Sequence, residues 1–265
     1  MSARHWVQRA AIAYDRLRPP PPGLVVLIYH RVGGGTDSMV DLPAEIFEAQ
    51  LTHLTASRDV FTLDDAVARL ARGETPDGVV LTFDDGTPDF HDVAVPILQR
   101  HGVPATLYAC TGPIDRGDPM PWGAPSATWD GLRTAVATGL VTIGAHTREH
   151  PLLDALDRET VADQLDTCIA SITREIGTAP THFAYPKAVP GNPAAEVEVR
   201  ARFASAALAG NRVNRPGGDL HRLWRTPVHR TDTPEVFARK VRGGLRLEGI
   251  VREQVAKVRA RKEHA

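Results

Sequence analysis

Short, continuous apolar runs alternate with amphipathic segments along most of this 265-residue chain. The apolar runs have the length of strands, and a run that is apolar throughout is typical of a strand buried on both faces of a parallel sheet. They occupy residues 24–30, 78–81, 105–110, 140–145, 181–185 and 203–208. Between them, apolar positions recur at helical spacing in residues 43–57, 63–70, 93–101, 129–138 and 159–176. The pattern therefore predicts alternating strands and helices.

This alternation runs from residue 24 to about residue 230, and it predicts an α/β fold of βα repeats with parallel strands. About seven strands in about 200 residues favour a (β/α) barrel over an open sheet. Residues 111–127 are rich in Gly and Pro and predict a long loop. The carboxyl ends of parallel strands meet at one edge, so we expect functional side chains to gather there.

The two ends of the chain differ from the repeating part. Residues 6–17 have helical apolar spacing and precede the proline run 19–22, which predicts a short amphipathic helix and a stiff spacer. Such a helix ordinarily packs on its own domain, and membrane-surface docking is the alternative. Residues beyond 234 predict helix, with nine Lys or Arg against three Glu in 239–265. We therefore divide the chain into residues 1–23, a main domain 24–233 and a basic helical extension 234–265.

Composition and charge exclude several classes of protein. The net charge of −1 gives no reason to expect a nucleic-acid partner. Cys110 and Cys168 lie in apolar contexts and do not form a disulfide framework. No run approaches the roughly 18 apolar residues of a transmembrane segment. Because Arg4, Arg9 and Arg16 interrupt the first residues, we expect no secretory leader and a cytoplasmic location. A membrane-surface location, or export by a non-standard route, is the alternative.

The most informative stretch is Thr-Phe-Asp-Asp-Gly at residues 82–86, directly after an apolar run. Adjacent carboxylates at the end of a buried strand repel each other unless a cation or a proton lies between them. The alternative is a turn in which Asp84 and Asp85 cap backbone amides. The pair therefore indicates a cation site if the chain supplies further ligands.

His146 and His150 are the candidate further ligands. They follow the apolar run 140–145, and their i, i+4 spacing would aim both imidazoles at one point on a helical turn or a tight loop. Two histidines at this spacing are also common on ordinary surfaces. One carboxylate with two imidazoles leaves positions open on a divalent ion, which is the catalytic arrangement. The second carboxylate is then free to act as a base.

These motifs resemble those of the polysaccharide deacetylase family, the NodB homology domain of carbohydrate esterase family 4. Residues 82–86 match its first motif, residues 146–150 its second, and the similarity runs from residue 29 to about 228. The layout resembles the exopolysaccharide-type branch. The resemblance implies a distorted (β/α) barrel of about seven repeats and identifies residues 24–233 as the catalytic domain. It implies one divalent metal ion, with zinc the first expectation and cobalt, nickel or iron as alternatives. Asp85, His146 and His150 would bind that metal, and Asp84 would be the catalytic base.

The same resemblance suggests roles for other residues. An oxyanion-binding backbone N–H is expected near Tyr185, in a segment similar to the third motif. Ala184 stands where many members have an arginine that orients the base, and Arg225 is the candidate replacement; a surface ion pair is the alternative for Arg225.

Three more side chains are candidates. His229 is the nearest candidate for the general acid, because a histidine can donate a proton near neutral pH. His30 ends the first apolar run and could contact substrate or be a structural histidine. Trp122 could stack on a sugar, and a core or lid tryptophan is the alternative.

The sequence therefore predicts a metal-dependent hydrolase that removes N-acetyl groups from amino sugars in a polysaccharide or glycoconjugate. O-deacetylation of a sugar and N-deformylation are the alternatives among hydrolases. A carbohydrate-binding homologue without turnover is the alternative from another class, although a binder has no need of Asp84 as a base beside a metal. The expected partner is an N-acetylated carbohydrate, with peripheral membrane contact as an unsupported alternative.

Overall fold

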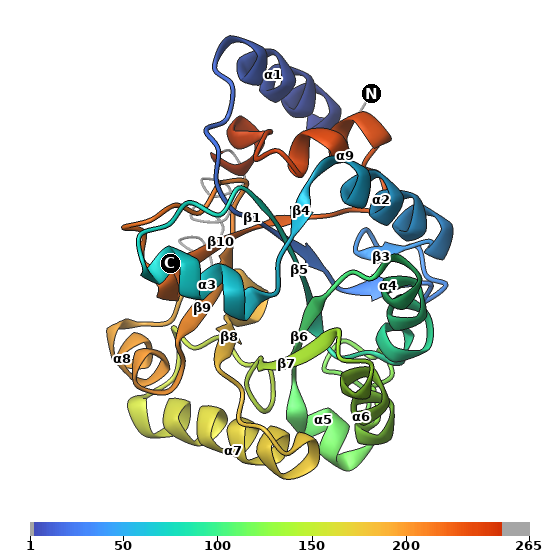
Figure 1. The fold of residues 1–265 in the computed structure, drawn as a ribbon. Helices are drawn as coiled ribbons and strands as arrows, with labels where there is room; N and C mark the ends of the chain where they lie inside the picture. The colour runs from blue at the N-terminus through green and yellow to red at the C-terminus, as the bar shows by residue number, and fades with distance from the viewer. Residues whose placement is uncertain (1–2, 251–265) are drawn as a thin grey trace.

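Seven parallel strands form a closed barrel in the computed structural model, which describes residues 3–250 (Figure 1). They are β1 (Val25–Tyr29), β5 (Gly78–Asp85), β6 (Ala105–Ala109), β7 (Val141–Ala145), β8 (His182–Ala184), β9 (Ser205–Ala209) and β10 (Leu223–Pro227). The strand order is β1-β10-β9-β8-β7-β6-β5, and β1 also pairs with β5, which closes the ring. Apolar side chains on both faces of these strands explain why the runs show no alternation. The predicted barrel of parallel strands is confirmed.

Helices on the outside of the barrel bury their apolar faces against the strands. They are α2 (Ala44–Ser57), α4 (Val95–His101), α6 (Trp129–Ala137), α7 (Arg158–Ile176) and α8 (Pro193–Arg202), and a π-helical turn, Phe90–Ala94, leads into α4. Local signals set their ends: Asp157 accepts a hydrogen bond from the N–H of Thr160 at the start of α7, and Gly177 ends it with a φ of 84°. Helix α8 and strand β10 were not distinguished in the sequence pattern.

Helix α3 (Leu63–Ala71) closes the amino end of the barrel. In Figure 1 it crosses in front of the strands. Its buried side chains pack on residues that point into the barrel, including Val80 and Tyr108. Thr62 caps the helix by accepting a hydrogen bond from the N–H of Asp65. Short strand β4 (Asp59–Val60) extends the sheet outside β5. Because α3 covers the amino end of the barrel, a site open to substrate can form only at the carboxyl end.

One predicted loop is partly wrong. Residues 111–127 begin with helix α5 (Thr111–Arg116), and only the residues after it form a loop. Pro113 is compatible with this helix because it lies in the first turn, where a backbone N–H has no partner to lose. The Gly and Pro content therefore concealed a short helix. A second connection contains the two-stranded sheet of β2 (Arg31–Val32) and β3 (Asp41–Leu42).

The terminal helices lie side by side on the outside of the barrel (Figure 1). Helix α1 (Ala3–Leu17), which the sequence predicted, contacts the region of α9 (Pro234–Lys240) through Ala11, Val236 and Leu245. The predicted basic helical extension is described only as far as residue 250, and residues 251–265 lie outside the described part. The division of the chain at residues 23 and 233 stays a prediction. Among the described residues, no helix has the length and apolar content that a membrane span requires.

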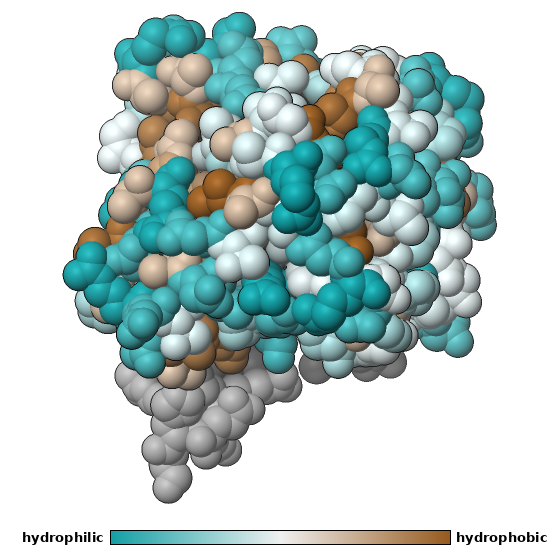
Figure 2. Space-filling view, turned by 90° about the horizontal axis from the view of Figure 1, so that it is seen from below, coloured by the Kyte–Doolittle hydropathy of each residue, from teal (hydrophilic) through white to brown (hydrophobic). Residues whose placement is uncertain are grey.

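The outer face formed by the lower helices of Figure 1 is mainly polar. Figure 2 shows the molecule from below, with hydrophilic residues over most of the surface and apolar residues in small, separate patches. Single exposed apolar residues of this kind are ordinary on a globular protein. This face therefore gives no indication of a binding surface.

Candidate active site

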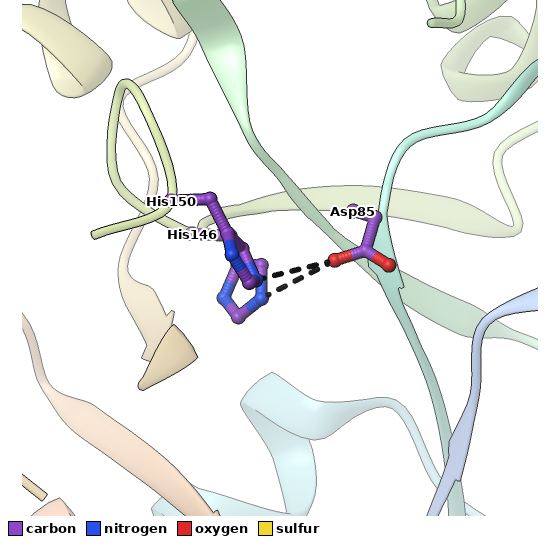
Figure 3. A group of neighbouring side chains, drawn as sticks. All are labelled: Asp85, His146 and His150. Carbon is purple, nitrogen blue, oxygen red and sulfur yellow. Dashed lines mark ion pairs between the residues drawn. The ribbon is translucent and has the colours of Figure 1, made fainter. Parts of the chain in front are cut away.

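Asp85, His146 and His150 converge at the carboxyl end of the barrel (Figure 3). Asp85 is the last residue of β5, and both histidines lie in the turn after β7. The Oδ1 atom of Asp85 lies 3.5 Å from Nε2 of His146 and 3.6 Å from Nε2 of His150. One ligand atom from each residue lies within 4.8 Å of the other two. Side chains 61 and 65 positions apart in sequence thus share one point.

The backbone around this cluster has unusual dihedral angles. Asp85, Thr147 and His150 have φ values of 78°, 67° and 60°, in the left-handed region that residues with a Cβ rarely occupy. Hydrogen bonds hold the turn in this conformation: the N–H of His146 donates to Ala109 O, and the N–H of His150 donates to Oγ1 of Thr147. Strain of this kind persists where the surroundings fix it, which is common at functional sites.

A main-chain carbonyl on the side away from Asp85 orients the ring of His146. Its Nδ1 lies 2.7 Å from the carbonyl oxygen of Ala184, which can only accept, so Nδ1 carries a proton and Nε2, which faces Asp85, is the nitrogen that can bind a metal. This arrangement is the usual one for a histidine that binds a metal through Nε2. Ala184 thus contributes its main-chain carbonyl to the site.

The electrostatics of the cluster favour a cation. Burial lowers the pKa of His146, but the carboxylates of Asp85 and Asp84 outweigh burial and leave the pKa above its ordinary value. Burial, together with His146, lowers the pKa of His150 to about 4. The two imidazoles are therefore not both in the positively charged, doubly protonated form at neutral pH. A divalent ion at the centre would take the place of a proton and balance Asp85 and Asp84.

The three ligands also fit a cation in their spacing. Metal–ligand bonds of about 2.1 Å in a tetrahedral arrangement place neighbouring ligand atoms about 3.4 Å apart. The distances of 3.5 and 3.6 Å from Asp85 to the two imidazoles agree with that value. The residues present thus fit a divalent metal with ligand positions left for substrate or water.

Asp84 points to a different partner from its neighbour. Its Oδ1 and Oδ2 atoms accept hydrogen bonds from Nη1 and Nη2 of Arg225, at 2.5 and 2.8 Å. Arg225 is fully buried, so its alternative assignment as a surface ion pair is wrong. The guanidinium also donates to Oγ1 of Thr82 and lies 5.1 Å from the centre of the Tyr108 ring. A planar fork facing both oxygens fixes the carboxylate in one orientation.

The ion pair keeps Asp84 charged although it is buried. Burial by itself raises the pKa of the Asp84 carboxyl, but Arg225 and then His146 lower it, to about 2. Arg225 reaches it from the middle of β10, 141 residues away in sequence. Asp84 is thus an ionised, oriented carboxylate next to the Asp–His–His cluster.

A cleft of about 470 Å³ opens over these groups. It is lined by Ile28, His30, Val40, Asp84, Asp85, Trp122, His146, His150, Lys187, Ala188, Ala209, Pro227 and His229. His30 and Trp122 therefore both lie at the cleft, as the sequence suggested. The indole of Trp122 is 45% exposed and stands edge-to-face with His150 at a ring distance of 5.0 Å. Trp122 is thus not a core residue, and its ring is accessible from the cleft.

His229 lies in the cleft on the turn after β10. Its backbone N–H donates to Oδ2 of Asp232, and Nδ1 lies 3.5 Å from the ammonium of Lys240. Lys240 and the side chain of Asp232 are both fully buried and form an ion pair at 2.5 Å. Lys240 also donates to the carbonyl of Pro227. This buried pair, which the sequence analysis missed, holds the His229 turn against α9.

Tyr185 does not occupy the predicted position. Its side chain is buried, and its backbone N–H donates to Ala207 O, as the ladder from β8 to β9 continues past Ala184. Pro186 has no N–H. The next N–H belongs to Lys187, which lines the cleft with a φ of 52°, followed by Ala188 with a φ of 55°. The hydrogen bonds of the described residues use the N–H groups of Ala188 and Val189 but not that of Lys187. The proline at 186 was the sequence signal for this shift.

Comparison with known proteins gives the family. A family model described as polysaccharide deacetylase matches residues 71–203, half of the chain. The chain belongs to the polysaccharide deacetylase family. The prediction of a hydrolase of this type is thereby confirmed at the level of the family. Carbohydrate is the partner that the family implies, and a metal site is consistent with the Asp–His–His cluster.

Individual relatives agree with this family. The sequence is 32% identical over 91 residues to a putative polysaccharide deacetylase, YxkH, of Bacillus subtilis, and this match covers 33% of the chain and 32% of that protein. The structure of IcaB from Ammonifex degensii is 27% identical, with a TM-score of 0.73 over 86% of this chain and 98% of that one. The Streptococcus pyogenes deacetylase PplD, in complex with acetate, has a TM-score of 0.73 over 83% and 99% at 20% identity, which supports the fold.

Proposed function

We propose that this protein is a metal-dependent deacetylase that hydrolyses the N-acetyl group of an amino sugar. The observation that carries the proposal is the bidentate Arg225–Asp84 pair directly beside the Asp85, His146 and His150 cluster. A buried arginine that fixes one carboxylate beside a cation site has a purpose in proton transfer but none in simple carbohydrate binding. Membership of the polysaccharide deacetylase family supports the same class of reaction.

The adjacent carboxylates divide two tasks between them. Asp85, His146 and His150 would hold a divalent ion, which when bound supplies Lewis acidity and lowers the pKa of a coordinated water. Asp84 would accept a proton from the attacking water at one of its carboxylate oxygens. With a pKa of about 2 it is a weak base, so it holds that proton briefly and releases it readily. Arg225 positions Asp84 for this transfer.

The remaining cleft residues have supporting roles. His229, on its fixed turn, would donate a proton to the amine as it leaves the acyl carbon. The N–H of Lys187, rather than that of Tyr185, would donate to the oxygen of the acetyl carbonyl as negative charge develops there. The exposed ring of Trp122 would stack on a sugar, and His30 would contact the sugar from the opposite wall. The donor set suits zinc first, with cobalt, nickel or iron as alternatives.

Acetate release tests the proposal. The purified protein, stripped with a chelator and reloaded with Zn²⁺, Co²⁺, Ni²⁺ or Fe²⁺, is assayed on N-acetylglucosamine oligomers, a nucleotide sugar and a lipid-linked amino sugar. An O-acetylated sugar and an N-formylated amino sugar serve as competing substrates. We expect metal-dependent acetate release from an N-acetyl substrate. Release from the O-acetyl substrate alone would make the protein an esterase, and carbohydrate binding without any release would leave a binding role. The expectation of a cytoplasmic location stays a prediction.

A further inference from the structure

Helix α1 packs on the protein with its polar side inward. Gln8, Ala11 and Asp15 are buried, on the face that contacts the α9 region. A carboxylate oxygen of Asp15 accepts the N–H of Leu245 at 2.5 Å, and the guanidinium of Arg246 lies 3.9 Å away. The apolar part of this contact is small: Ala11 is buried with Val236 and Leu245, and the half-buried Ile12 packs against them. The helix is thus held by hydrogen bonds at Asp15 and at the carbonyl of Arg18, together with a small apolar cluster.

The outward face of α1 carries the larger apolar side chains. Trp6 is 58% exposed, Tyr14 37% and Leu17 84%. Ala10 and Ala13 are exposed between them, and the five positions follow one stripe at helical spacing. A surface helix of a globular protein normally turns such a stripe toward the core and its charged residues outward. In α1 the stripe faces outward.

The charges beside the stripe all have one sign. Arg9, Arg16 and Arg18 are exposed, while Asp15 is buried, so residues 6–18 expose three cations and no carboxylate. The guanidinium of Arg9 lies 5.8 Å from the centre of the Trp6 ring, and that of Arg246 lies 5.6 Å from the Tyr14 ring. Aromatic residues with arginines at their edge are typical of a helix that lies in the headgroup region of a membrane.

We propose that the outer face of α1 binds the surface of an anionic phospholipid membrane. A second copy of the chain fits less well, because a symmetric contact would place Arg9 and Arg16 against the same cations. The stripe of five residues is also small beside the roughly 800 Å² per partner of a stable protein interface. Anionic headgroups pair with the arginines while the hydrocarbon boundary takes Trp6 and Leu17.

Two features of the chain agree with this surface. Helix α1, as far as the structure describes its side chains, contributes no residue to the cleft over Asp84 and Asp85, so its outer face has no part in the catalytic machinery. The contact of α1 with Leu245 also brings it next to the start of the basic sequence, in which residues 251–265 contain five Lys or Arg and two Glu. Basic segments of this kind strengthen attraction to anionic lipid.

Vesicle sedimentation of the full chain tests the proposal. We expect binding to vesicles of phosphatidylcholine with about 30% phosphatidylglycerol, and little to phosphatidylcholine alone. Binding should weaken on raising the salt from about 0.1 M to about 1 M, since the screening length falls from ~10 Å to ~3 Å. The variant with Trp6→Ser and Leu17→Ser should bind roughly tenfold more weakly or worse. The variant with Arg9→Glu and Arg16→Glu should lose binding in the same way.

Val197→Ser provides the matched control. Val197 is 55% exposed on α8, far from α1 in sequence, and its loss should leave vesicle binding unchanged. All these positions are on the surface, and melting temperatures equal to that of the parent protein would verify folding. Equal binding by the α1 variants and the parent, or no binding to anionic vesicles, would overturn the proposal. So would a concentration-dependent dimer that the Trp6→Ser and Leu17→Ser variant abolishes, since the stripe would then be a self-association surface.

Discussion

At the amino end of the barrel, Asp64, His182 and Ser205 form a chain of hydrogen bonds that has the residue types of an acid–histidine–serine triad. Nε2 of His182 lies 3.0 Å from Asp64 Oδ1, and Nδ1 lies 2.9 Å from Ser205 Oγ. At the carboxyl end, Asp85 faces two imidazoles across 3.5 and 3.6 Å. Both clusters join a carboxylate to histidine from different elements of the fold.

What separates the two clusters is access and spacing. Ser205 is fully buried and His182 is 4% exposed beneath α3, so a substrate cannot reach the hydroxyl. The bonds at the amino end are ordinary hydrogen bonds that satisfy every partner, whereas the carboxyl-end ligand atoms stand apart by the distance that a shared cation requires. The first cluster fastens α3 to β8 and β9. The second one is left open for chemistry, as expected of this end of a (β/α) barrel.

Replacing one histidine in each cluster by glutamine should give the largest difference in metal binding between the two ends of the barrel. His146→Gln should weaken metal binding by more than about 100-fold and remove activity, because a ligand is lost outright. His182→Gln should bind metal normally and melt at a lower temperature. Metal content after dialysis, measured beside thermal unfolding, distinguishes the two. Normal metal content in the His146 variant would remove it from the ligand set.

Arg225→Met tests the pair that links β10 to the open cluster. It leaves the Asp84 carboxylate buried and without a partner, which typically costs about 3–5 kcal/mol of folding stability. Activity should fall with it, and Arg225→Lys should restore the charge but not the two-pronged orientation of Asp84. Chemical denaturation with acetate assays on both variants measures these effects. Full activity in the lysine variant would show that charge alone is required.

The parts of this site that lie close in sequence were predictable, and the others were not. Asp84-Asp85 ends one strand and His146–His150 follows another, so local pattern revealed them. Arg225 reaches Asp84 across 141 residues, and only resemblance to a family gave it as a candidate. Nothing local shows that a residue in the middle of β10 points to the tip of β5. The closed barrel, by contrast, followed from repeated apolar runs that are each buried locally.

Two further features depend on tertiary contacts. The Lys240–Asp232 pair behind His229 joins a helix to a turn, and each residue alone looks like a surface charge. The shift from Tyr185 to Lys187 depends on where the ladder with β9 ends. Asp64 and His182 are 118 positions apart, and their sequence contexts gave no reason to pair them. Such side-chain partners are fixed by topology, which a residue pattern describes only coarsely.

His229→Gln tests whether His229 donates a proton in the cleft at the carboxyl end of the barrel. Loss of a general acid should lower kcat on an N-acetyl substrate by about 10²-fold or more, because the amine must leave protonated. Hydrolysis of an aryl acetate should fall much less, since a phenolate leaves without a proton. The ratio of the two kcat effects is the measurement. Equal losses on both substrates would assign His229 to positioning rather than to proton donation.

Asp64→Asn should give the smallest effect, a small loss of folding stability that arises only in the Asp64–His182–Ser205 cluster. The hydrogen bond from His182 lowers the pKa of Asp64, so its contribution to stability is present above its ordinary pKa. That contribution disappears as the pH falls through the lowered value. The difference in unfolding free energy between parent and variant should be below about 1 kcal/mol near pH 7, because the side chain is half exposed, and smaller near pH 3. A difference that grows in acid would contradict the assignment.

The central claim is that the two adjacent carboxylates have separate tasks, and metal content with turnover in parallel variants tests it most directly. Asp84→Asn and Asp85→Asn are prepared together, loaded with zinc, dialysed and assayed for acetate release. The account predicts stoichiometric metal with turnover lost in Asp84→Asn, and both metal and turnover lost in Asp85→Asn. Undiminished acetate release by Asp84→Asn, or stoichiometric metal in Asp85→Asn, would contradict it.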